Sequence, residues 1–173
     1  ITASFLNFLD AIYAFYLPFT SSFSGFHNIF AYILVAQSIG SIIGALIISL
    51  VKKKIELKHF LHFLLPGAIS LMLINSLKFS KVIILILFAI FSTTVAMFNV
   101  NLMSHLQISI DSNFLGRIFS IIFTISGLFA PFGTLFASWI DIKSWQIFQL
   151  IGIGQLVIYL VSLLFINLNS EKS

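Results

Sequence analysis

The residue of this chain most able to do chemistry is Asp10, which lies in the middle of a long apolar stretch. Asn7 precedes it by about one helical turn, so in a helix the two side chains share a face. A carboxylate inside a membrane helix costs about 2.5–3.5 kcal/mol on insertion scales and usually marks an ion or substrate pathway. Asp10 is therefore a candidate for proton coupling or for binding a cationic substrate. The alternative is a carboxyl that pairs structurally with another helix or lies near the membrane interface.

Two further polar stripes occur at helical spacing. Gln37 shares a face with Ser41, and Asn101 shares one with threonine, methionine and histidine side chains. Such stripes favour helices that line a wet cavity, and we expect Gln37 and Asn101 to line it together with Asn7. Asn99 is expected to point elsewhere. The alternative for the Asn101 stripe is hydrogen bonding between helices, which contributes about 0.6 kcal/mol on average. The alternative for the Gln37 stripe is plain helix packing.

Small residues and one proline mark places where helices pack closely or bend. Gly40 and Gly44 form a GxxxG pattern, which lets two membrane helices approach each other. Gly127 is followed by Pro131, and a proline inside a helix removes one hydrogen bond and favours a kink. We expect these four residues to act in packing or bending.

The composition identifies the environment in which these residues must work. Hydrophobic residues make up 60% of the 173 residues and charged residues only 8%, against about 25% charged residues in soluble domains. This indicates a membrane protein. The chain has no cysteine, no phosphate-binding loop and no HExxH motif, so we predict neither an enzyme nor a metal site nor an organic cofactor. The basic residues lie in short loops, so no nucleic-acid partner is expected.

Apolar segments long enough to cross a bilayer follow one another along the chain. They are too long, and alternate too little, for barrel strands, so we predict an all-α bundle of six transmembrane helices in one domain, residues 1–173. The predicted spans are 2–19, 28–51, 60–77, 82–110, 118–140 and 145–168.

The loops between these spans predict an orientation in the membrane. An even number of spans places both termini on one side, and that side would hold six basic residues against three on the other. The six are Lys52, Lys53, Lys54, Lys58, Arg117 and Lys172, and the three are Lys78, Lys81 and Lys143. The positive-inside rule therefore predicts a multi-pass protein of the cytoplasmic membrane with both termini in the cytoplasm.

The region around the predicted fourth loop resembles a known family. Residues 98–107, then Asp111, then 116–120, which begin with Gly116 and Arg117, resemble the helix 10 to helix 11 region of the major facilitator superfamily. More narrowly, they resemble its macrolide-efflux-type drug exporters. Residues 17–18 and 37–44 are similar to parts of helices 7 and 8 of that superfamily. The loop after residue 51 departs from the family pattern, because it lacks the acidic residue and the second glycine of the family motif.

This resemblance implies that residues 1–173 are helices 7–12, the C-terminal half of a twelve-helix transporter with a three-plus-three inverted repeat. It implies alternating access, with substrate bound near mid-membrane, and a cytoplasmic gate that includes Asp111, Gly116 and Arg117. The expected function is proton-coupled export of amphipathic small molecules or drugs, with the proton gradient as energy source and Asp10 as coupling residue. The expected partners are the lipid bilayer, the substrate and the N-terminal half. The alternative is a six-helix membrane subunit that transports nothing and assembles with a partner protein.

Overall fold

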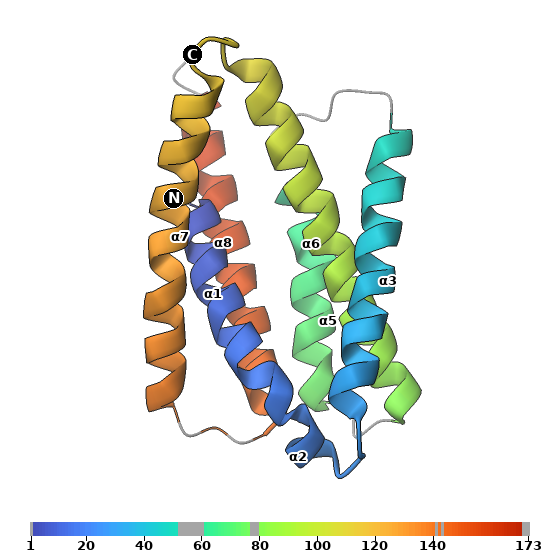
Figure 1. Cartoon of the computed structure of the whole chain (residues 1–173). Helices are drawn as coiled ribbons and strands as arrows, with labels where there is room; N and C mark the ends of the chain where they lie inside the picture. Colours follow the sequence, from blue (N-terminus) through green and yellow to red (C-terminus); the bar gives the residue numbers. More distant parts are fainter. Residues whose placement is uncertain (1, 52–60, 77–79, 141, 143, 171–173) are drawn as a thin grey trace.

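The computed structural model of the chain describes residues 2–51, 61–76, 80–140, 142 and 144–170, and in these residues it contains helices and no strand. The predicted all-α architecture is thus confirmed (Figure 1). The short first elements are α1 (Thr2–Tyr16), a 3₁₀ turn η1 (Leu17–Phe19) and α2 (Thr20–Ser24). The remaining helices are α3 (Ile29–Leu50), α5 (Leu64–Ser76), α6 (Lys81–Ser109), α7 (Leu115–Trp139) and α8 (Gln146–Ser170).

Among the described residues, four helices are long and apolar enough to cross a membrane: α3, α6, α7 and α8. Helix α5 is a shorter apolar helix, and α1 ends after 15 residues. The first predicted span continues past Tyr16 as η1, which contains Pro18, and then as α2. Because proline lacks the amide hydrogen that a helix interior needs, the regular α-helix ends before it. The four long helices indicate a membrane protein, while six crossings stay a prediction.

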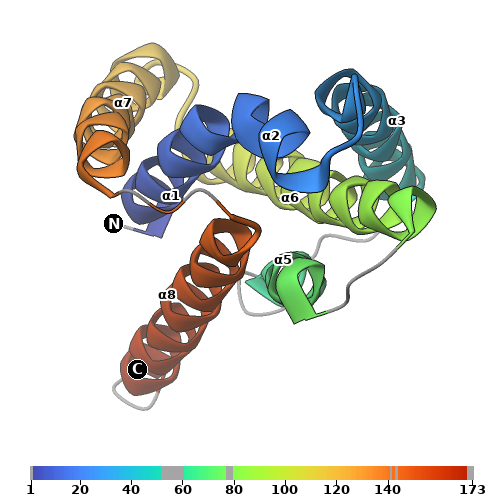
Figure 2. The same ribbon diagram turned by 90° about the horizontal axis from the view of Figure 1, so that it is seen from below.

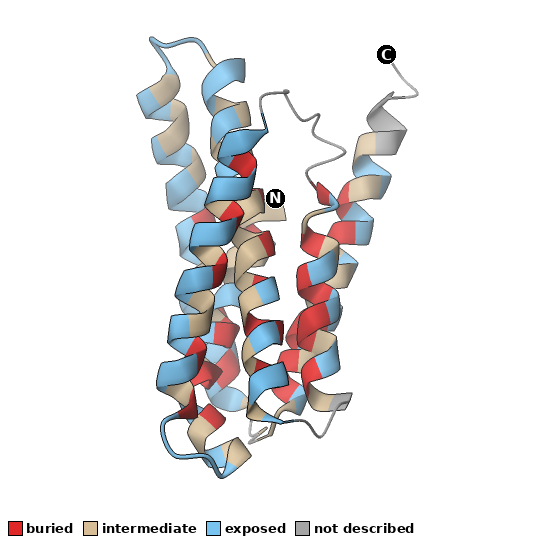
Figure 3. Cartoon of the chain, turned by 90° about the vertical axis from the view of Figure 1, so that its right-hand side faces the viewer, coloured by how far each residue is buried: buried red, intermediate tan, exposed pale blue. Residues whose placement is uncertain are grey.

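The helices pack in neighbouring pairs. Helix α3 lies along α6, α1 along α7 and α5 along α8, and α5 and α8 also contact α6 and α1 respectively. Viewed from below, α7, α1 and α3 form one side of the bundle and α5 and α8 the other (Figure 2). Buried residues lie where helices meet, and the outward faces carry exposed apolar side chains (Figure 3). Leu50 and Trp139, for example, are 78% and 84% exposed, which suits a surface in contact with lipid.

Glycines lie where the α3 and α6 backbones approach each other. A methyl group on Gly40 would collide with the carbonyl oxygen of Ala89, and one on Gly44 would collide with that of Thr93. Both glycines are buried. The GxxxG pair is therefore situated at a helix contact that a larger residue would force apart.

The two other helix pairs also meet at glycine. Gly133 of α7 lies against the carbonyl oxygen of Phe8 and the Cβ of Ala11 on α1, and Gly152 of α8 lies against the carbonyl oxygen of Ala68 on α5. Gly127, in contrast, is exposed and has no atom within 4 Å of the place where a Cβ would be. Helix α7 runs on through Pro131, which is also exposed.

An aromatic cluster fills the centre of the bundle. Tyr13 packs on Phe91 with 4.9 Å between ring centroids and on Phe148 with 5.6 Å, and Phe88 meets Phe148 at 5.3 Å. These four rings come from α1, α6 and α8 and are all buried. Edge-to-face and tilted pairs at such distances add stabilisation beyond area burial. They hold the ends of α1 and α8 against α6.

Substitution of a contact glycine should destabilise the bundle. We expect Gly44→Ala to cost about 1–3 kcal/mol, because α3 and α6 would have to separate to admit the methyl group. Thermal unfolding of the purified protein in detergent, followed by circular dichroism, measures this change. Gly127→Ala is the matched control and should leave the melting temperature unchanged or raise it. Equal melting temperatures for the two variants would contradict the packing described for α3 and α6.

Candidate functional site

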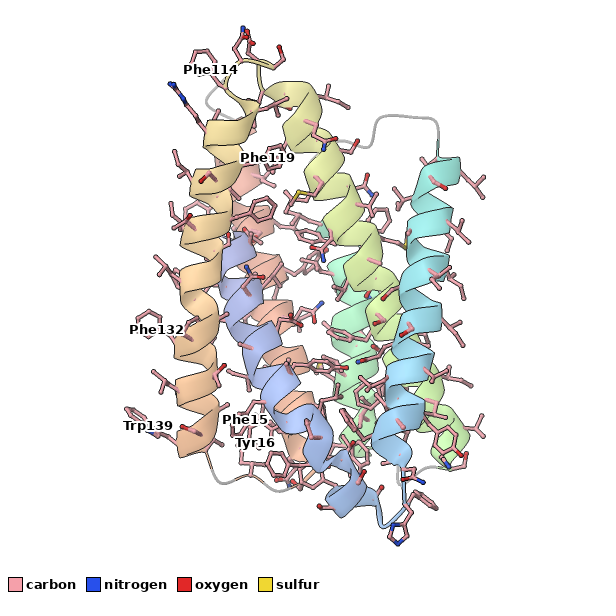
Figure 4. All side chains as sticks on the ribbon, viewed as in Figure 1. Phe15, Tyr16, Phe114, Phe119, Phe132 and Trp139 are labelled. Carbon is pink, nitrogen blue, oxygen red and sulfur yellow. The ribbon has the colours of Figure 1, made fainter. Side chains whose placement is uncertain are left out.

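A cavity of about 70 Å³ lies between α1 and α6, with walls from α5 and α8 as well. Its polar lining residues are Asn7, Asp10, Tyr13, Asn99 and Gln155. Its apolar lining residues are Leu6, Leu9, Leu64, Phe91, Val95, Phe98 and Ile151. Side chains of α1 and α6 point toward each other across the space between these helices (Figure 4). Of the cavity residues predicted from the sequence, this region contains Asn7 and Asp10.

Helical periodicity brings the lining residues together. On α1, Leu6, Asp10 and Tyr13 recur at intervals of three and four residues and so share one face. The lining residues of α6 share one face in the same way. They are Phe91, Val95, Phe98 and Asn99. The cavity therefore lies between two opposed faces of regular helices, and its formation needs no unusual backbone conformation.

Asp10 is an exposed side chain on the cavity wall. It forms no hydrogen bond or ion pair with any of the residues that the structure describes, so the structural pairing considered as an alternative is not seen among them. Asn7 is half-buried one turn away on the same wall. A carboxylate with no protein partner in such a place can hold a proton or a cation.

Gln37 reaches the cavity only indirectly. Its side chain is not part of the lining; instead its Nε2 donates a hydrogen bond to the hydroxyl of Tyr13. Tyr13 is buried, and its ring forms part of the cavity wall. Gln37 thus ties α3 to α1 and orients a lining residue from behind, rather than lining the cavity as expected.

The structure places Asn99, and not Asn101, on the cavity. Asn101 donates from Nδ2 to the carbonyl oxygen of Met97, one turn back on its own helix, at 3.1 Å. Asn99 is exposed and shares the cavity face with Val95. Helix α6 turns its more apolar face toward α1, so the stripe that carries Asn101 does not line the cavity.

Gln155 of α8 also lines the cavity, although it was not among the residues expected there. It is 3% exposed, and its Nε2 donates to the carbonyl oxygen of Leu64 at 3.1 Å. Gly67, on the same stretch of α5, is small enough to let Gln155 approach. The signal that points to it is its amide: within the apolar stretch of a membrane helix an amide needs a partner or water.

The predicted gate residues lie at the turn between α6 and α7. Asp111, Gly116 and Arg117 are all exposed, and nothing lies within 4 Å of a Cβ position on Gly116. Oδ1 of Asp111 accepts a hydrogen bond from the backbone nitrogen of Asn113 at 2.9 Å, so the carboxylate closes the local turn. No ion pair joins Asp111 to Arg117 in this structure, and the three residues stay a prediction as a gate.

Metal binding has no candidate centre in the described residues. No three His, Asp or Glu side chains there come together as ligands of one ion. The chemistry that the cavity can supply is that of one carboxylate, a phenol and three amides in apolar surroundings.

The assignment of Asn99 to the cavity can be tested by labelling, because the chain contains no native cysteine. We expect Asn99→Cys to react with a small water-soluble thiosulfonate faster than Asn101→Cys, since thiolates react only where water reaches them. The measurement is the labelling rate of each single-cysteine variant in membranes. Equal rates, or a faster reaction at position 101, would show that the cavity face is wrongly assigned.

Comparison of the sequence with protein-family models finds no match, and comparison with curated proteins and with solved structures finds none either.

Proposed function

We propose that this chain is a six-helix half of a proton-coupled secondary transporter, which exports amphipathic small molecules across the cytoplasmic membrane. The observation that carries the proposal is Asp10, a carboxylate without a protein partner among the described residues, on the wall of a cavity between two apolar helices. Ionisable residues in such positions serve proton relays and substrate sites. Asp10 takes the role of coupling residue, and Asn7 and Asn99 supply neighbouring polar contacts.

The helix contacts support an internal repeat, in which α1, α3 and α5 correspond to α6, α7 and α8. Gly44 of α3 lies against the backbone of Thr93 on α6, and Gly133 of α7 lies against the backbone of Phe8 on α1. In each case an alanine three residues further along completes the contact; these alanines are Ala96 and Ala11. The contact of α3 with α6 thus has a counterpart in that of α7 with α1.

A second pair of contacts follows the same correspondence. Gly67 of α5 lies against Thr94 of α6, and Gly154 of α8 lies against Leu9 of α1, where an added methyl group would be 3.1 Å from the leucine side chain. The corresponding helices α1 and α6 run in opposite directions (Figure 1). A repeat with inverted direction is the arrangement expected of secondary transporters, which bind substrate between repeats.

The same correspondence gives the cavity two related walls. When Phe8 is matched with Thr93, three of the five lining residues of α1 fall on lining residues of α6: Leu6 on Phe91, Asp10 on Val95 and Tyr13 on Phe98. The cavity therefore lies between equivalent faces of the two proposed repeats, and only one face carries a carboxylate. This supports a site at the interface of the repeats.

A partner covering the α7 side fits the exposed polar groups there. Helix α7 has the fewest buried residues of the long helices, and several of its small polar side chains are exposed. These are Ser120 and Thr124, together with Thr134 and Ser138, whose hydroxyls donate to carbonyl oxygens of their own helix. Polar groups gain little from lipid, so protein or water is the better neighbour. The N-terminal half of the transporter would supply both. In the alternative, a non-transporting subunit, a partner protein would also cover the α7 side, but no proton flux would be measured.

Replacement of Asp10 should separate transport from folding. We expect Asp10→Asn to abolish substrate–proton exchange while leaving the protein level intact, because the amide keeps the shape but cannot ionise. Proton movement on addition of ethidium, an amphipathic cation, to membrane vesicles with a pH-sensitive dye measures this. Asp10→Glu should retain exchange, and Asn101→Ala, which lies off the cavity, serves as control. Full exchange by Asp10→Asn would remove Asp10 from the mechanism.

The repeat predicts that the carboxylate can be moved to the other wall. Asp10→Val alone should abolish proton exchange, and the double variant Asp10→Val, Val95→Asp should recover part of it, because positions 10 and 95 are equivalent across the cavity. The same vesicle assay measures both variants. Recovery is expected to fail when the carboxylate is placed at position 100 instead, which lies outside the cavity lining. Equal recovery at both positions would argue against equivalent walls.

A further inference from the structure

The charge of the cavity lining is one-sided. Asp10 is its only carboxylate, and no Lys, Arg or His is among its lining residues. Two cations of the described chain lie elsewhere. Lys81, in the first turn of α6, has its Nζ 3.8 Å from the ring centroid of Tyr32 on α3. Arg117 is exposed at the start of α7. When ionised, Asp10 thus lacks a neutralising group within the cavity. A bound group of positive charge would provide one.

Aromatic rings line the same space. Tyr13 and Phe91 pack with 4.9 Å between their centroids, and Phe98 adds a third ring to the lining. A cation within about 6 Å of a ring centroid is attracted by the negative face of the ring, and organic ammonium groups are bound in this way. Small hydrated metal ions gain less from such walls, because they prefer several oxygen ligands. The combination of one carboxylate with rings favours an organic cation.

The amide groups and the volume of the cavity further restrict the class of ligand that it can bind. The amide oxygens of Asn7, Asn99 and Gln155 carry partial negative charge that can face a cation, and the Nε2 of Gln155 is already bonded to the Leu64 carbonyl. A volume of about 70 Å³ holds on the order of five waters, well below the roughly 300–1,000 Å³ of sites for whole drug-sized ligands. The cavity therefore fits a head group, with the rest of the molecule outside it.

We propose that the cavity between α1 and α6 binds the ammonium head group of an amphipathic cation, with Asp10 against the charge and the rings of Tyr13 and Phe91 against its alkyl substituents. This inference rests on the proposed transport function for its biological meaning, but binding can be measured without transport. It makes Phe91 a specificity-determining residue for charged over neutral ligands.

The test compares choline with its uncharged isostere dimethylbutanol, in which a quaternary carbon replaces the nitrogen. The full chain is placed in lipid nanodiscs, binding of labelled choline is measured, and dimethylbutanol is used as competitor. We expect choline to bind at least about tenfold more tightly than the isostere. Asp10→Asn should weaken choline binding by at least about tenfold, and the off-cavity variant Asn101→Ala should not change it.

A second variant keeps the test decisive if Asp10→Asn unfolds, which its melting temperature would reveal. Phe91→Leu keeps an apolar wall and should weaken choline binding several-fold, while competition by the isostere stays the same. Equal affinity for choline and the isostere, or binding that ignores both substitutions, would overturn the ammonium site. If proton exchange still depends on Asp10 in that case, the transport proposal survives. Asp10-dependent choline binding without any proton exchange would instead support the ammonium site and contradict the proposed transport function.

Discussion

The direct approach of helix backbones at glycine is the constraint on which this structure depends. Where Gly44 meets Thr93 and Gly133 meets Phe8, there is no room for a side chain, so each helix pair can join in only one register. Those registers determine which residues of α1 and α6 remain to face each other. A shift by one residue would rotate Asp10 and Val95 away from the cavity. The position of the carboxylate thus follows from contacts that contain no charged group.

Membrane burial and function make opposite demands on this chain. The outward faces of α3 and α7 carry large exposed apolar side chains, which are stabilised by contact with lipid, whereas an ionised Asp10 would be destabilised by it. The cost of about 2.5–3.5 kcal/mol for a charged residue at mid-helix falls when the residue faces other protein groups or water. The cavity provides such surroundings through Asn7, Asn99 and Gln155. The stabilisation comes from aromatic and glycine contacts around it.

The sequence predicted the helices better than it predicted which face of each helix would matter. Long apolar segments need helical hydrogen bonding whatever they pack against, so the all-α architecture could be derived without a partner. The face of α6 that meets α1 depends on where α3 and α5 attach, which no local pattern encodes. For this reason Asn101 was expected on the cavity and Asn99 away from it, whereas Asn99 is the one that lines it. Gln37 was expected to line the cavity, but its side chain donates a hydrogen bond to Tyr13 instead.

The central claim is that the Asp10 carboxyl stands in a cavity that water and protons can reach from the bulk. Magnetic resonance on the chain in bilayers, with isotope-labelled aspartate, observes this carboxyl directly, and Asp10→Asn identifies its signal. The account predicts a signal that shifts reversibly as the bulk pH is changed. A signal of Asp10 that stays constant throughout the pH range in which the protein remains folded would mean a sealed, structural carboxyl, and would contradict the account.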